Sequence, residues 1–317
     1  MRLIWLAATL AAAAWASAPA IAQNNGQNTG QNADRNADQN TGQNLGQTPH
    51  TAPLATLKLA PWRTRWVMEA EIAGKTRRYL FDTGAGLSLA SFETVKAAGC
   101  TPWGRMTGFR MMGDRSDGAK CEGVTVGISG ISRTPAVFGL IDMGKLNPKD
   151  AELDGVFGLN LFENDTITID FAAGILTVES ERSRAARIAG MQPLPIRLKR
   201  EVDGLALAAI VAVPVKEGTL WMEMDSGNGG TILVSKPVAA MVGMDPAAEG
   251  KQRADFAVAG DIRATSDDAF SPDMIIDGNL GMPFLRNWVV TLDLKQGLAW
   301  LGKPPVPPAP AQPLPPQ

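Results

Sequence analysis

Two short acidic motifs are the strongest candidates for chemistry in this sequence. Residues 82–84 read Asp-Thr-Gly and residues 225–227 read Asp-Ser-Gly, and each motif directly follows an apolar run of the kind that forms a β-strand. Two carboxyl groups held about 3 Å apart cannot both ionise, so they share one proton. Such a pair keeps a general acid and a general base together at moderate pH. Asp82 and Asp225 are therefore the candidate catalytic residues.

A single motif of this type carries little information, because aspartate and glycine are also ordinary β-turn residues. The two copies differ from chance turns because their surroundings repeat. Residues 154–158 read Asp-Gly-Val-Phe-Gly, and residues 277–281 read Asp-Gly-Asn-Leu-Gly. After the last glycine of each block, an aspartate follows at twelve residues and a glycine at sixteen. We infer an internal duplication.

The elements that must position the motifs can be read from the same repeat. Helical patterns at residues 92–98 and 236–242 follow the motifs, preceded by Ser91 and Ser235 at N-cap positions and followed by glycines. Strand-like segments at 166–171 and 288–294 each lead into a hairpin-type turn. Many short apolar runs, with 33 Gly and 22 Pro, favour a turn-rich, mostly β protein.

Composition excludes several classes of function. A net charge of −2 provides no basic field for nucleic acid. The only histidine, His50, lies in a low-complexity segment, so Ser-His-Asp catalysis and histidine-based zinc sites are not expected. Two cysteines cannot form a Cys₄ zinc site. We expect no metal and no other cofactor, which leaves carboxylates, water and backbone groups for the chemistry.

The ends of the chain predict export. Residues 1–22 have the positive start, apolar stretch and Ala20-Ile21-Ala22 sequence of a signal peptide cleaved after Ala22. The apolar stretch is too short for a membrane span, so we expect a periplasmic or secreted mature protein without one. Cys100 and Cys121, the only cysteines, fit one disulfide in an oxidising compartment, and two separate buried thiols are the alternative.

Low-complexity and proline-rich segments set the expected domain boundaries. Residues 23–55, rich in Asn, Gln and Gly, predict a disordered linker, and residues 304–317 predict an extended tail. Between them we expect an N-terminal lobe at residues 56–182 and a C-terminal lobe at residues 183–303.

These motifs resemble a known family. Residues 82–85, Asp-Thr-Gly-Ala, look like the catalytic motif of retropepsins, and residues 280–288 resemble the Leu-Gly-x-x-Phe-Leu-Arg region of pepsin lobes. Over residues 79–301 the chain is similar to bacterial pepsin/retropepsin-like aspartic proteases with two lobes in one chain. The resemblance implies a bilobal acid-protease fold of two pseudo-twofold-related, β-barrel-like lobes, each with a short helix. It also implies a monomeric aspartic endopeptidase acting on a peptide or protein substrate.

The resemblance also implies a role for each part of the site. A water molecule would lie between Asp82 and Asp225, where the ionised carboxylate takes its proton and the protonated one binds the scissile carbonyl. The motif hydroxyls would bond to the opposite loop, the motif glycines would let backbone N–H groups approach the carboxylates, and two further glycines would lie beneath the loops. These supporting residues are Thr83, Gly84, Ser226, Gly227, Gly158 and Gly281.

Two departures from the pepsin pattern keep a second interpretation open. The only tyrosine, Tyr79, precedes the first motif, so the flap tyrosine of pepsins is missing. Residues 103–114 are the expected flap, although their aromatic residues would equally suit a core. Ala85 and Asn228 replace the Ser or Thr that pepsins have after the glycine. The alternative function is an envelope peptide-binding protein that kept the cleft and lost turnover.

Overall fold

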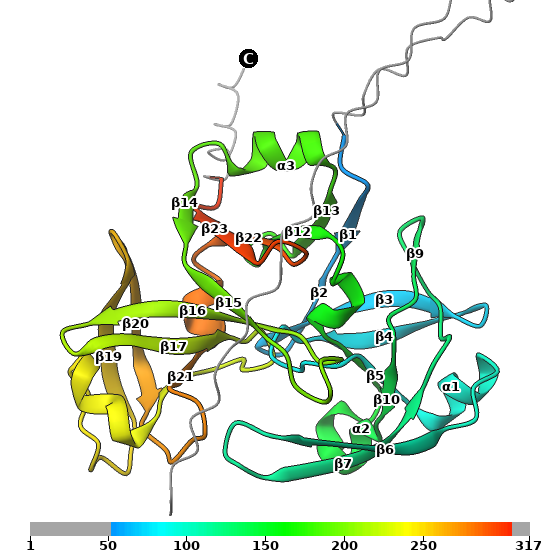
Figure 1. The fold of residues 1–317 in the computed structure, drawn as a ribbon, viewed down its shortest axis with the longest axis horizontal. Coiled ribbons are helices and arrows are strands. Elements are labelled where there is room, and N and C mark those ends of the chain that lie inside the picture. The colour runs from blue at the N-terminus through cyan, green and yellow to red at the C-terminus, as the bar shows by residue number, and fades with distance from the viewer. Residues whose placement is uncertain (1–51, 306–317) are drawn as a thin grey trace, which may run out of the picture. The chain divides into compact units, whose positions relative to one another are not determined.

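The computed structural model describes residues 52–305. The predicted signal peptide, residues 23–51 of the predicted linker and residues 306–317 of the predicted tail lie outside the described residues. In the described part, no helix is long and apolar enough to cross a membrane. The prediction of a mostly β protein is confirmed: three sheets contain nearly all of the regular structure (Figure 1).

The first lobe is built on a ten-stranded sheet, in the order β6-β7-β10-β5-β11-β4-β3-β8-β9 with β2 paired to β3. Its strands are β2 (Ala60–Trp62), β3 (Arg65–Ile72), β4 (Lys75–Phe81), β5 (Leu89–Ala90), β6 (Trp103–Phe109), β7 (Arg115–Cys121), β8 (Val126–Ile128), β9 (Ile131–Arg133), β10 (Phe138–Leu140) and β11 (Gly155–Phe157). Its helices are α1 (Phe92–Ala97), α2 (Met143–Leu146) and the 3₁₀ turns η1 (Pro148–Asp150) and η2 (Leu159–Phe162).

The second lobe repeats this plan on a seven-stranded sheet, in the order β15-β16-β17-β21-β18-β20-β19. Its strands are β15 (Ile196–Lys199), β16 (Ala208–Val215), β17 (Gly218–Met224), β18 (Ile232–Val234), β19 (Gln252–Ala259), β20 (Ile262–Phe270) and β21 (Gly278–Leu280). The short helices η3 (Lys236–Val242) and α4 (Met282–Leu285) accompany it.

A third sheet takes strands from both halves of the chain. Its order is β1-β13-β12-β22-β23-β14, formed by β1 (Ala55–Lys58), β12 (Thr166–Asp170), β13 (Ile175–Glu179), β14 (Gln192–Leu194), β22 (Val289–Asp293) and β23 (Leu298–Gly302), and α3 (Glu181–Ile188) follows β13. At its centre β12 and β22 pair antiparallel, and Thr168 lies opposite Thr291 with their hydroxyls 2.9 Å apart. These threonines are equivalent in the repeat, so the approximate twofold axis passes between them.

The predicted elements recur in the structure with one correction. Helix α1 begins after Ser91, whose hydroxyl accepts the Thr94 N–H at 3.2 Å. The second helical segment, η3, is 3₁₀, and Ser235 does not cap it. The Ser235 hydroxyl instead donates to the Met274 carbonyl at 3.2 Å, because a loop distant in sequence packs beside it. The segment ends at Gly243 with a left-handed backbone, as the sequence predicts.

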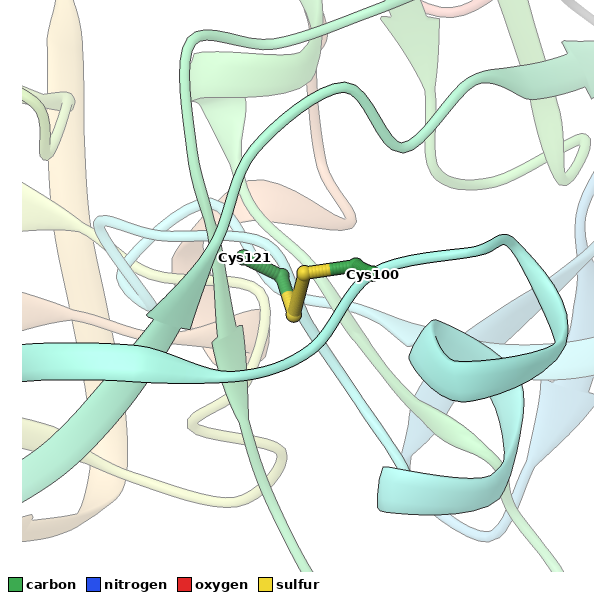
Figure 2. The surroundings of a disulfide bond; sticks show 2 residues. All are labelled: Cys100 and Cys121. Atoms are coloured by element: carbon green, nitrogen blue, oxygen red, sulfur yellow. A yellow bond between two sulfur atoms is a disulfide. The ribbon is translucent and has the colours of Figure 1, made fainter.

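The predicted disulfide is confirmed. Cys100, just after α1, is bonded to Cys121 at the end of β7, with Cα atoms 5.9 Å apart (Figure 2). Cys121 is fully buried. The bond therefore fixes the base of the β6–β7 hairpin to the segment that follows the first motif.

Candidate active site

The two acidic motifs meet at the interface of the lobes. Asp82 follows β4 and Asp225 follows β17, and each of these strands pairs in parallel with the strand that ends at the repeated glycine, β11 or β21. The Asp82 N–H donates to the Phe157 carbonyl at 3.0 Å, and the Asp225 N–H donates to the Leu280 carbonyl at 3.1 Å. The duplicated strands thus present both aspartates in the same way.

The side chains of Asp82 and Asp225 face each other and are hydrogen-bonded. Each carboxyl also packs against the glycine of the opposite loop. A Cβ atom on Gly84 would lie 2.6 Å from Asp225 Cγ, and one on Gly227 would overlap the Asp82 carboxyl. Only glycine fits at either position, because any side chain would displace the opposite aspartate.

Four reciprocal hydrogen bonds fix the two loops to each other. The Thr83 hydroxyl donates to the Met224 carbonyl at 2.7 Å and accepts the Ser226 N–H at 3.0 Å. The Ser226 hydroxyl donates to the Phe81 carbonyl at 3.0 Å and accepts the Thr83 N–H at 3.0 Å. Both hydroxyl residues are buried, so these bonds hold the separation of the loops without competition from water.

The two aspartates receive unequal numbers of hydrogen bonds. Among the described residues, the N–H donor to Asp82 is the Gly84 amide, at 2.9 Å. Asp225 accepts the Gly227 N–H at 2.7 Å and the Asn228 N–H at 3.2 Å. It also accepts a side-chain amide, Asn279 Nδ2, at 2.8 Å. More N–H donors stabilise a carboxylate more, so the negative charge belongs on Asp225.

Electrostatics place the proton on Asp82. Burial raises the pKa of Asp82 well above its usual range, and the charge of Asp225 raises it further. The Gly84 hydrogen bond acts in the opposite direction, and it is outweighed. These surroundings therefore favour the protonated form of Asp82 within the pair.

Asn279 is a member of the site that the sequence did not reveal. Its side chain bridges two groups, because Asn228 Nδ2 donates to Asn279 Oδ1 at 2.8 Å while Asn279 Nδ2 donates to Asp225. The equivalent positions of the first lobe hold Val156 and Ala85, whose side chains have no hydrogen-bond donor. The only signal in the sequence was this asymmetry between the two repeats.

The repeated glycines lie beneath the catalytic loops. A Cβ atom on Gly281 would lie 2.6 Å from the Asn228 carbonyl oxygen, and one on Gly158 would lie 3.2 Å from the Leu87 carbonyl carbon. The Gly158 N–H also donates to the Ser88 hydroxyl at 3.2 Å. These glycines let the loops pack directly on the strands below them.

A cleft of ≈ 970 Å³ contains both aspartates and is lined by residues of both lobes. The β6–β7 hairpin borders it, and Met106, Phe109 and Met111 of this hairpin line the cleft. Phe109 is 54% exposed, so this residue of the expected flap does not belong to the core. The hairpin tip reaches the second lobe, where the Ile275 N–H donates to the Met111 carbonyl at 3.0 Å.

Tyr79 belongs to β4 and not to this hairpin. Its ring is fully buried and stacks on Phe157 with ring centroids 4.1 Å apart, and its hydroxyl donates to Asp154 at 3.1 Å. Asp154 accepts two further hydroxyls, which is the structural role the repeated aspartates suggest. Within residues 52–305, no group of three or more Asp, Glu, Cys or His side chains is arranged to hold a metal ion.

Comparison with protein-family models and with curated protein sequences found no match. Among solved structures, the chain is similar to basic 7S globulin from soybean, with a TM-score of 0.52 at 8% sequence identity. The match covers 78% of this chain and 94% of that one. At this identity the likeness shows the fold alone, and it confirms the predicted bilobal, pepsin-like fold.

Proposed function

We propose that the protein is an aspartic endopeptidase that hydrolyses peptide bonds with a water molecule activated between Asp82 and Asp225. One observation carries the proposal: the two carboxyls face each other in a cleft between two lobes, and their environments favour one shared proton. Two titratable groups whose surroundings separate their protonation states are a typical acid–base pair.

The unequal hydrogen bonding gives each aspartate a role. Asp225 takes a proton from the water as its oxygen attacks the scissile carbonyl carbon, while Asp82 transfers its proton to the carbonyl oxygen. Asp225 then passes its proton to the amide nitrogen, and the C–N bond breaks. One hydroxyl of the tetrahedral carbon returns a proton to Asp82, which yields a carboxylic acid and an amine and restores the pair.

Other features support an extended substrate and an exported enzyme. The cleft is large enough for several residues of an extended peptide. Both aspartates come from one chain, which supports a monomer. The disulfide suits the periplasm or the exterior, as does the predicted signal peptide.

A second candidate function is that of a peptide-binding protein that does not cleave the peptides it binds. Two observations favour it: the described hairpin carries no tyrosine, and Ala85 gives Asp82 no side-chain donor. This protein would bind extended peptides in the same cleft and leave them intact.

Turnover distinguishes the two candidates. The purified mature protein is incubated with denatured casein between about pH 3 and about pH 7, with and without pepstatin. We expect cleavage that pepstatin inhibits and that both Asp82→Asn and Asp225→Asn abolish. Peptide binding without cleavage across this range would favour the second candidate. An inactive Asp82→Asn beside a fully active Asp225→Asn would contradict a site formed within one chain.

A further inference from the structure

The two halves of the cleft differ at one equivalent position. Two residues before each catalytic aspartate, the first lobe has Leu80 and the second has Glu223. Leu80 is buried in an apolar cluster that includes Val67, Met143 and Val156. Glu223 is also buried, 5% exposed, yet it lines the cleft. A buried carboxyl thus replaces the apolar residue that the duplication would place there.

The surroundings of Glu223 leave it without a cation of its own. Among the described residues it forms no ion pair, and its hydrogen-bond partner is the side chain of Asn279. Lys199 also lines the cleft, but its ammonium pairs with Glu201 at 3.1 Å. One lysine therefore faces two glutamates, and the ionised Asp225 adds more negative charge nearby.

This imbalance affects the protonation of Glu223. Burial first, and then the charges of Asp225 and Glu201, together raise its pKa to about 8 against the opposing charge of Lys199. In the free protein the carboxyl is therefore neutral at acidic and moderate pH. A cation entering the cleft would lower this pKa, so the carboxyl would lose its proton to solvent and form the ion pair that the site lacks.

The first-lobe wall of the cleft has a different chemistry. Four apolar residues, Leu89, Leu140, Ile141 and Val156, line it. Its acidic residues already have cations, because Asp142 pairs with Lys145 at 3.4 Å and Asp117 pairs with Arg105 at 2.6 Å. This wall suits an apolar side chain. A substrate lying across Asp82 and Asp225 would therefore present its neighbouring side chains to two unlike surfaces.

We propose that Glu223 forms a subsite for a basic side chain, so that the cleft selects peptides with an apolar residue on one side of the scissile bond and lysine or arginine on the other. This inference rests on the proposed function and specifies its substrate class. Glu223 lies on β17 two residues before Asp225, so the subsite lies next to the reacting bond.

Three peptides that differ only in the central pair test the specificity. The pairs are Leu-Arg, Arg-Leu and Leu-Leu, and cleavage is followed as kcat/KM with the cut site identified by mass spectrometry. We expect one basic peptide to be cleaved about tenfold faster than Leu-Leu, the effect of one charge-assisted hydrogen bond. In Glu223→Leu, which restores the residue of the first lobe, this preference should disappear. Glu223→Gln, which keeps the shape, should weaken it.

The control variant is Glu217→Gln. Glu217 is an exposed residue of the same β16–β17 hairpin and does not line the cleft. The variant should keep the wild-type preference. Equal cleavage of all three peptides would overturn the inference, as would a preference that survives in Glu223→Leu.

A binding measurement on Asp82→Asn separates this inference from the proposed function. If the wild-type protein cleaves nothing beyond the Asp82→Asn blank, the proposed function fails, but the fluorescence anisotropy of the same labelled peptides still tests the subsite. The subsite is supported if one basic peptide binds more tightly than Leu-Leu and if this difference is lost when Glu223→Leu is added. Equal affinities, or no binding of any peptide, overturn it.

Discussion

At the scale of single residues, the asymmetry of the site centres on Asn279. Its amide is the one side-chain N–H donor to Asp225 among the described residues, and the first lobe has Val156 in its place. A hydrogen bond to a charged group contributes about 1.5–3 kcal/mol, so this contact is large enough to decide which aspartate is ionised. Asn279 is thus a positioning residue that acts through Asp225.

Asn279→Val tests this role by giving the second lobe the residue of the first. Without the amide the shared negative charge is less stable, so we expect the acidic limb of the pH profile of kcat/KM to move up by about one to two pH units. The position of the limb is the readout, because a general loss of structure lowers the curve without moving it. Asn287→Ala, which removes an exposed amide bonded to the Pro283 carbonyl, should leave the limb in place.

Gly227 provides a steric test of the facing geometry. Gly227→Ala would place a methyl group on the Asp82 carboxyl, and a displacement of about 1 Å in an active site lowers the rate by about 100-fold. We expect at least this loss in kcat, with a lower Tm from overpacking. Gly230→Ala is the control. Gly230 lies three residues after Gly227, and a Cβ atom added there would have no other atom within 4 Å. A Gly227→Ala enzyme as active as Gly230→Ala would contradict the geometry.

The sequence predicted the two aspartates and their loops because motif, spacing and repeat are all local patterns. Asn279 could not be predicted in the same way, since only the pairing of β21 with β17 places it beside Asp225. Glu223 reads as one polar residue within an apolar strand until the fold shows that its side chain lines the cleft. Ser235 fails as an N-cap for the same reason: a distant carbonyl, that of Met274, takes its hydroxyl.

At the scale of elements, the β6–β7 hairpin borders the cleft and is held at both of its ends. The disulfide fixes its base, while its tip is bonded to the second lobe through the Ile275 N–H. A peptide that enters the cleft beneath the hairpin would have to break this hydrogen bond. The sequence analysis named residues 103–114 as the expected flap, with a core role for their aromatic residues left open. It could not predict the contact with the second lobe, because the partner loop lies more than 150 residues away.

Ile275→Pro removes the donor of this contact. One hydrogen bond is worth about 1 kcal/mol, so the open form should become about fivefold more populated. We expect kcat/KM for denatured casein to rise by up to this factor. Asp273→Ala, an exposed residue of the same loop, is the control and should behave as wild type. An unchanged or lower rate at unchanged Tm would show that the contact does not limit access.

At the scale of the whole molecule, the third sheet joins the lobes, because it takes strands from both halves of the chain. The central pairing of β12 with β22 places equivalent threonines, Thr168 and Thr291, on the twofold axis. The sequence predicted the two strands separately from their β-branched residues and turns. It could not predict that they pair with each other, because no local pattern specifies a partner 123 residues away.

The buried carboxyl of Glu223, which lines the cleft, must also affect the stability of the whole chain. Burial raises the pKa of Glu223 from an ordinary 4.5 to about 8, so the folded protein binds this proton more tightly than the unfolded chain does. Stability should therefore fall as the pH rises from about 4.5 to about 8 and level off above that. Each pKa unit corresponds to about 1.4 kcal/mol, which bounds the loss at about 5 kcal/mol.

Urea unfolding of the wild type and of Glu223→Gln, measured across this pH range, checks the sign and the source of the effect. Glutamine does not titrate, so the variant should have a flatter curve and should exceed the wild type in stability near pH 8. Asp82, whose pKa is also raised, contributes a slope of the same sign that both proteins keep. Glu217→Gln should follow the wild type, because its side chain is exposed. Parallel curves for the wild type and Glu223→Gln would mean that the Glu223 carboxyl is solvated in the folded protein, which would also remove the basis for a cation subsite there.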